Sequence, residues 1–401
     1  TNIVFNLDKS FRVKNLLYSS SGNITHLELY SQGKRTIEKY LPQYRSKITL
    51  KDTRVKFVKS KSDQITELDG LIKISNSFDN FKIKEKYNHS KKNFDIEGVL
   101  DLTNSEVNVS KLNYMKDRGI ESKLNFKTTF VVNKYYNINK LEYLADKTKI
   151  YLSNVQLNKN FELIDFDTLE INTFLNGIKN NDFSAKKLEK IIISGDVYDA
   201  QPLLKSLYKK DKRRTFSKNF NNEVKINFKK ALTGTNDDVS DFAMIALINK
   251  GSYEKLNLKG NFSKNEIVEM SIYQIDKDKK TLQIISDRAR PFVKNFDFIK
   301  GFEDGKLEYE SIISKEGSRS NLTITDFKVS KVPALAQLLT LASLRGIADT
   351  LSGEGIRFES FEMETNSEGN LIYIEDALAI GPAVSILLEG YVDKGKTVSL
   401  R

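Results

Sequence analysis

Apolar and polar residues alternate along most of this chain, and that alternation constrains the fold more than any other feature. Val224, Ile226 and Phe228, for example, alternate with Lys225 and Asn227. Successive side chains of a β-strand point to opposite faces, so a period of two predicts strands with one buried face. The pattern returns in short runs throughout the chain, and clusters of Asn, Asp, Gly and Ser separate the runs. We therefore expect many short strands joined by polar turns.

The segments between these runs distinguish a parallel from an antiparallel sheet. No run is followed by an amphipathic helix of comparable length until late in the chain, which disfavours βαβ winding. Glycine follows an apolar position in Ile96-Glu97-Gly98 and in Leu258-Lys259-Gly260, as expected for bends that curve a sheet. We predict a mainly β fold: an elongated, curved, groove-like antiparallel sheet with one or two short helices. The 401 residues are many for one compact core, which such a sheet does not need.

Two segments depart from the strand pattern. Pro202 opens the apolar segment 203–208, which suits a short helix with proline in its first turn. Residues 333–351 place apolar side chains at helical spacing, with Arg345 and Asp349 as their charges, and Gly353 follows them. A helix as apolar as this second one requires cover from a sheet, a partner protein or lipid.

The charge balance is basic but dispersed. Lys and Arg total 64 against 53 Asp and Glu, for a net charge of +11 and a pI near 9.2. Most lysines stand singly, and residues 209–214 form the dense cluster, either a solvated loop or a contact for anionic headgroups. Aromatic and basic residues do not interleave as in RNA-binding proteins, so nucleic acid is not an expected partner.

Residues that carry chemistry are sparse. The chain has no cysteine, and its two histidines, His26 and His89, stand far apart, so we expect no metal site and no cofactor. Residues 390–397 match the phosphate-loop pattern, but that loop requires a helix directly after it, and the flanking residues predict two strands joined by a turn. Asp165 and Asp167 are expected on one polar strand face. No nucleophile stands beside a base, so we do not expect an enzyme.

The C-terminal half resembles a known family. The segments that resemble the AsmA-like C-terminal region of proteobacterial envelope proteins are 327–329, 332–336, 342–349, 355–358, 369–376, 381–383 and 389–393. Residues 195–204 are similar to a second block found in YhdP-like relatives. Asp287–Arg290 departs from the family, which tends to have a small Asp-Ala-Gly turn there. We therefore divide the chain into a repetitive β-sheet region, 1–190, and an AsmA-like β region, 191–401, with a helix near 333–351.

The resemblance implies a location and a function. Members of the AsmA, TamB and YhdP group look like long curved β-sheets whose apolar groove carries phospholipid between the inner and outer membranes. We accordingly expect a periplasmic lipid-binding and transfer protein, anchored to the inner membrane by a segment outside this fragment. Residues 332–344 are too short a run for a spanning helix, which needs about 20 apolar residues. Thr1 is compatible with removal of a leader.

The expected partners are phospholipid or another acyl-chain lipid, membrane surfaces and envelope proteins. The residues expected to face lipid are Leu335, Leu338, Leu339, Leu341, Leu344, Ile347, Ile372, Ile374, Val384, Ile386 and Leu388. Acyl chains would stabilise an uncovered apolar face by about 0.8 kcal/mol per buried methylene. The alternative is a structural or assembly scaffold of the envelope, in which that face packs on itself without lipid.

Overall fold

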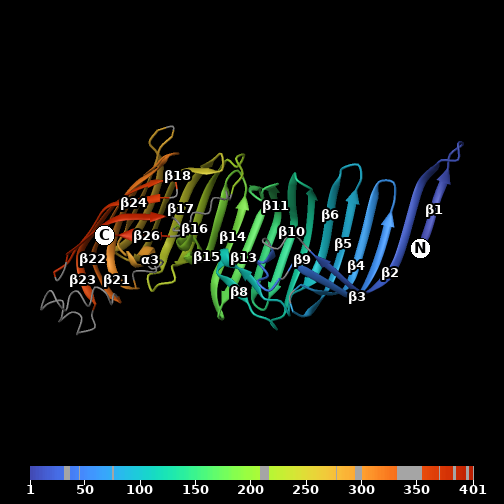
Figure 1. Ribbon diagram of the computed structural model, residues 1–401, viewed down its shortest axis with the longest axis horizontal. Coiled ribbons are helices and arrows are strands. Elements are labelled where there is room, and N and C mark those ends of the chain that lie inside the picture. Colours follow the sequence, from blue (N-terminus) through green and yellow to red (C-terminus); the bar gives the residue numbers. More distant parts are fainter. Residues whose placement is uncertain are drawn as a thin grey trace. The chain divides into compact units, whose positions relative to one another are not determined.

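The computed structural model describes residues 1–30, 37–44, 46–74, 76–207, 216–276, 278–293, 300–331, 355–369, 371–382, 385–393 and 397–400. The chain divides into two compact units of similar size. Unit 1 comprises residues 1–193 with 213–220, and unit 2 comprises residues 194–212 with 221–401. Each unit is a sheet whose strands follow one another in chain order (Figure 1).

Unit 1 is an antiparallel meander. Its strands are β1 (Asn2–Leu7), β2 (Val13–Tyr30), β3 (Lys47–Lys59), β4 (Asp63–Lys73), β5 (Phe78–Asn88), β6 (Asn93–Asp101), β9 (Ser122–Val131), β10 (Tyr135–Ala145), β11 (Thr148–Asn158), β12 (Leu163–Asp165), β13 (Thr168–Leu175) and β14 (Ile178–Lys187). Each strand pairs antiparallel with the next in this order, except that β12 and β13 both pair with β11 and not with each other. β15 (Ile191–Asp199) lies where the two units divide.

A small excursion interrupts the meander of unit 1 between β6 and β9. It contains β7 (Val107–Val109), the 3-10 helix η1 (Ser110–Leu112) and β8 (Tyr114–Lys116), and β7 pairs with β8 in a sheet of its own. Val107 and Tyr114 are buried in one cluster with Tyr143 and Ile150. The excursion therefore covers one end of the apolar face of unit 1.

Unit 2 repeats the architecture. After the helix α2 (Gln201–Leu207) come β16 (Asn222–Leu232), β17 (Val239–Asn249), β18 (Ser252–Ser263), β19 (Glu266–Gln274), β20 (Lys280–Ser286), the helix α3 (Arg290–Val293), β21 (Lys300–Ile313), β22 (Gly317–Lys331), β23 (Ile356–Glu368), β24 (Leu371–Ile380), β25 (Ser385–Asp393) and β26 (Thr397–Leu400). All eleven of these strands pair antiparallel with their neighbours in the chain.

The burial of side chains follows the alternation in the sequence. In β16, Val224 and Phe228 are buried, whereas Lys225 and Asn227 are exposed. The prediction of a mainly β, open antiparallel sheet with short helices is confirmed, and the short helix expected at Pro202 is α2. The helix expected near 333–351 lies outside the described residues. In the described part of the chain, no helix combines the length and apolarity needed to cross a membrane.

Candidate functional site

An apolar row crosses ten strands of unit 2. Its members occupy successive cross-strand positions from β16 to β25, and we call them the apolar row of unit 2: Ile226, Met244, Leu258, Met270, Ile284, Tyr309, Leu322, Met363, Ala377 and Leu388. Ile284 and Ala377 are buried and the other eight are half-buried. No position in the row carries a charge.

Two flanking rows widen this surface. On one side lie Val224, Ala246, Leu256, Ile272, Leu282, Ser311, Ser320, Thr365 and Ile374, and on the other lie Val268, Ser286, Leu307, Ile324, Phe361, Ala379 and Ile386. Two serine hydroxyl groups of the first flanking row are paired: Tyr309 of the apolar row donates to Ser320 at 3.1 Å, and Ser320 donates to Ser311 at 2.8 Å. The surface is therefore apolar in character even where it contains serine.

One end of this face in unit 2 is closed by the protein itself. Phe302, Phe327 and Phe358 stack with ring centroids 5.1 and 5.2 Å apart. Phe292 and Val293 of α3 are buried in the same cluster. This end is a packed core, whereas the middle of the apolar row keeps partly exposed side chains.

Unit 1 has a corresponding row. The apolar row of unit 1 consists of Val55, Leu68, Ile83, Gly98, Phe126, Leu141, Leu152 and Leu169, which are successive cross-strand partners from β3 to β13. All eight are half-buried. Glu85 follows Ile83 by two residues along β5, so its carboxylate lies on the same face, between its cross-strand partners Thr66 and Ile96. Glu85 makes no hydrogen bond or ion pair with the described part of the chain.

Beside the row of unit 1 runs a ladder of rings. This aromatic row comprises Tyr87, Phe94, Phe130, Tyr136 and Phe161, with successive centroids 4.7, 5.1, 5.9 and 4.6 Å apart. The four members that lie in strands occupy partner positions next to the ends of β5, β6, β9 and β10. The aromatic row therefore borders the sheet edge at which those strands are connected.

The opposite face of unit 1 is charged and ion-paired. Lys82 lies 3.9 Å from Asp69, Lys84 lies 3.4 Å from Glu67, and Lys86 lies 3.4 Å from Asp63. These lysines alternate with Ile83, Glu85 and Tyr87 along β5, so the two faces differ sharply in polarity. An antiparallel sheet with one apolar and one solvated face produces this alternation.

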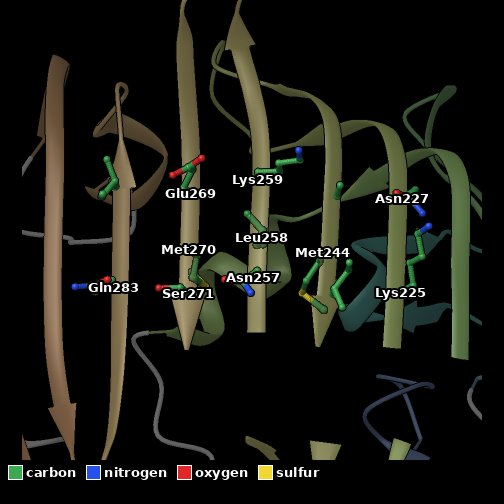
Figure 2. Close-up of a pocket in the computed structure, with 13 residues that line it drawn as sticks. Lys225, Asn227, Met244, Asn257, Leu258, Lys259, Glu269, Met270, Ser271 and Gln283 are labelled. Atoms are coloured by element: carbon green, nitrogen blue, oxygen red, sulfur yellow. The ribbon is translucent and has the colours of Figure 1, made fainter. Parts of the chain in front are cut away.

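The unit 2 sheet also carries a hollow, of about 460 Å³, over β16–β20, and its lining includes Met244, Leu258 and Met270 of the apolar row. Figure 2 shows its lining, in which Lys225, Asn227, Lys259, Glu269 and Gln283 are prominent. Most lining residues alternate with members of the apolar row and so belong to the opposite face of the sheet. The hollow offers amides and charges but no pairing of a nucleophile with a base.

The sequence candidates for chemistry have ordinary structural explanations. The phosphate-loop pattern falls on β25 and β26, which pair antiparallel from Gly390 to Thr397, so a strand follows it, as expected. Asp165 and Asp167 do not share a strand face, because β12 ends at Asp165. Asp165 lies 2.5 Å from the Lys187 ammonium, and Asp167 accepts a hydrogen bond from Asn154 at 2.6 Å. Within the described ranges, no group of three or more His, Asp or Glu side chains could hold a metal ion.

Four of the residues expected to face lipid lie on the apolar face of unit 2. Leu388 belongs to the apolar row, and Ile374 and Ile386 belong to the flanking rows. Ile372 lies two residues before Ile374 in β24, on the same face, and pairs with Val392. A register shift between Ile374 and Ala377 keeps both on this face. The other seven, Leu335, Leu338, Leu339, Leu341, Leu344, Ile347 and Val384, lie outside the described residues.

Sequence reasoning missed the apolar row of unit 1 and most of the row of unit 2. Ile226, Leu258 and Leu388 were visible as members of alternating runs. Strand pairing, which brings residues distant in sequence into one row, cannot be read from the runs themselves.

The chain matches no protein-family model, and no curated protein or solved structure is detectably similar to it. Fold and surface together define a class, the open antiparallel β-sheet protein with one extended apolar face in each unit. The AsmA-like resemblance remains a hypothesis beside that class.

Proposed function

We propose that this protein binds the acyl chains of phospholipid, or of a similar lipid, on the apolar faces of its sheets, and that it serves lipid transfer between the inner and outer membranes in the periplasm. The apolar row of unit 2 is the observation that carries the proposal. Ten consecutive uncharged positions, eight of them only half-buried, retain apolar surface that a ligand can still remove from water. Each methylene buried there contributes about 0.8 kcal/mol.

The direction of the row suits transfer. It runs across the strands, so the same apolar environment repeats at each interstrand step of about 4.8 Å. A chain lying along it meets no charged side chain that would hold it at one position. Binding of this kind is expected to be weakly selective among acyl chains, since contact area rather than polar pairing supplies the affinity.

A scaffold without lipid is the alternative. It is favoured by the packed end of the face, where Phe302, Phe327 and Phe358 stack beneath α3. If the whole face closed in this way, or against an envelope protein, no ligand would enter.

Lipid extraction and native mass spectrometry on protein purified without detergent separate the two functions. We expect co-purifying phospholipid, and lipid-free protein would contradict the proposal. Leu258→Gln places an amide in the middle of the apolar row and should lower lipid occupancy several-fold. Ile245→Gln is the matched control, because Ile245 lies on the opposite face of the adjacent strand and is already 54% exposed. Equal occupancy in both variants would exclude the apolar row as the binding surface.

A further inference from the structure

The connections of the unit 1 meander alternate between the two edges of the sheet at which the strands begin and end, as antiparallel pairing requires (Figure 1). Six of them therefore share one edge: 8–12, 60–62, 89–92, 132–134, 159–162 and 188–190. We call this edge of unit 1 the basic edge. The aromatic row lies directly inside it, because Tyr87, Phe130 and Tyr136 stand one or a few residues before or after these connections.

The charges of the two edges differ. The connections of the basic edge carry Lys9, Arg12, Lys61, Lys91, Lys92, Lys134, Lys159 and Lys190 against Asp8, Glu162 and Glu189. At the opposite edge, the fully described connections 102–121, 146–147 and 176–177 carry equal numbers of basic and acidic residues. With connection 31–46, which carries four basic residues and Glu38, the opposite edge has a net charge of +3, against +5 for the basic edge, which bears its charge on half as many residues.

Seven of the eight basic side chains of this edge are available. Lys9, Arg12, Lys61, Lys91, Lys92, Lys134 and Lys159 form no ion pair with any residue that the structure describes. Two of the acids are engaged within their own turns: Asp8 accepts hydrogen bonds from the amides of Ser10 and Arg12, and Glu162 accepts one from Asn158 at 2.7 Å. These carboxylates keep their negative charge, so the connections of the edge have the net charge of +5 that eight basic and three acidic residues give.

Apolar residues project from the same connections. Phe11 is 83% exposed, Leu188 is 66% exposed, Phe161 is 57% exposed and Val132 is 55% exposed. Each has a basic residue within three positions in the chain. Large apolar side chains displayed beside lysines are typical of surfaces that enter the boundary between headgroups and acyl chains.

Phe11 and Phe161 lie in two connections that form the same type of turn. The Phe11 amide donates to the Asp8 carbonyl at 3.0 Å, and the Phe161 amide donates to the Asn158 carbonyl at 2.9 Å. In both turns the side chain of the first residue accepts hydrogen bonds from the amides two and four residues on. Both phenylalanines have positive φ, 55° and 61°, a conformation unfavourable for a bulky residue. The turn therefore holds the Phe11 ring outward, whereas the Phe161 ring stacks on Tyr136 with centroids 4.6 Å apart and ends the aromatic row.

We propose that the basic edge of unit 1 docks on an anionic lipid bilayer surface. Lysine and arginine lie at the level of the phosphates, each worth about a fivefold gain in binding at a negative membrane surface. Phe11, Val132 and Leu188 enter the headgroup and acyl boundary. The aromatic row behind them occupies the interfacial zone that aromatic rings favour. This inference goes beyond the proposed function, because docking by the edge needs no lipid on the apolar rows.

Vesicle flotation with the whole chain tests the proposal at 0.15 M salt. The probe vesicles are phosphatidylcholine alone and phosphatidylcholine with phosphatidylglycerol. We expect binding to the anionic vesicles and at least tenfold weaker binding after Lys61→Gln, Lys91→Gln, Lys92→Gln and Lys134→Gln are combined. The matched control combines Lys39→Gln, Lys111→Gln, Lys123→Gln and Lys147→Gln at the opposite edge, which removes the same charge and should leave binding within about twofold. Circular dichroism verifies the fold of both.

Insertion of the tips is measured by fluorescence. Because the chain contains no tryptophan, Phe11→Trp introduces a single reporter at the basic edge, and Ile178→Trp introduces one at the 72% exposed position of the opposite edge. We expect emission from position 11 to shift to shorter wavelength with anionic vesicles and emission from position 178 to stay unchanged.

Equal losses in the two glutamine variants, equal binding to neutral and anionic vesicles, or an unshifted emission at position 11 would overturn the docking proposal. Leu258→Gln, which tests lipid on the apolar row, should bind vesicles as the unaltered chain does, so failure of one proposal is distinguishable from failure of the other.

Discussion

Lys116 shows how a single side chain can organise a part of this fold. It is almost fully buried, and its ammonium donates to the carbonyls of Leu102 at 2.7 Å, Ile120 at 3.1 Å and Thr103 at 3.3 Å. Burial lowers the pKa of Lys116, and nearby Asp79 and Asp101 oppose that effect. The lysine thus ties together both ends of the excursion that covers the apolar face of unit 1.

Lys116→Met should destabilise the protein by about 2–4 kcal/mol, because buried carbonyls lose their donor. Lys111→Met, at an exposed position of the same excursion, should change stability by less than about 0.5 kcal/mol. Urea unfolding followed by circular dichroism measures both. Similar stabilities for the two variants would mean that the excursion is held by its apolar contacts alone.

Asp79 makes the stability of the same region depend on pH. Its carboxylate accepts hydrogen bonds from the Asn104 amide at 3.0 Å and from Ser105 at 3.2 Å, yet burial raises the pKa of this carboxyl. A folded-state pKa above the unfolded value means that the folded chain binds the proton more tightly. The stabilising contribution is therefore complete below the unfolded pKa of about 3.9 and is lost as pH rises through the raised folded pKa.

The prediction is that the unaltered chain gains stability relative to Asp79→Asn as pH falls from 7 towards 4. Urea midpoints of both proteins at several pH values give the difference. A constant difference across that range, or one that grows with rising pH, would show that burial does not govern this carboxyl.

Neither residue could be identified from the sequence. Lys116 and Asp79 look like any other charged residue of the sequence. Their burial depends on contacts with other segments, 13 and 14 residues away for two of the Lys116 contacts and 25 and 26 residues away for those of Asp79. The same limit applies to Glu85, which alternation alone places on the apolar face without indicating which strands flank it.

At the scale of elements, the type of structure was predictable and the pairing was not. Alternation in β16 and β18 predicted strands, and Pro202 predicted the helix α2. The excursion from β7 to β8 was missed because its strands are only three residues long and its apolar residues follow no period. The apolar rows arise from register, which hairpin turns and packing set together.

Gly98 is a point at which β5, β6 and β9 approach closely. A Cβ atom at this position would lie 2.8 Å from the Lys82 carbonyl oxygen and 3.0 Å from the Phe126 ring. Gly98→Ala should therefore lower the free energy of unfolding by about 1–3 kcal/mol, because the Lys82 backbone would have to move to make room for the methyl group. Gly22→Ala in β2 is the control, because nothing lies within 4 Å of a Cβ there, and it should be neutral or slightly stabilising. Thermal unfolding compares the two, and equal effects would refute a packing role for Gly98.

At the scale of the whole molecule, the two units share one design. Each has its own buried clusters, and each strand bonds to the strands next to it in the chain. The fold class and the antiparallel arrangement of the strands could be predicted from the alternation and from the lack of helices between the runs. The location of the apolar surface was predicted only in part, because the sequence resemblance pointed to residues 333–351 and to a few positions of β24 and β25.

The neighbour-to-neighbour construction predicts that damage to one unit remains local. Phe327 is buried between Phe302 and Phe358, so Phe327→Ala should cost about 3–5 kcal/mol. In a sheet built from successive strand pairs, stability is approximately a sum over neighbouring elements, and the cost should appear in the strands that contact the cavity. Hydrogen exchange followed by mass spectrometry should show faster exchange in β21–β23 and α3, with unchanged protection in β3–β6 of unit 1. A uniform loss of protection would show instead that the chain unfolds as one cooperative body, and that lipid bound in either unit would stabilise both.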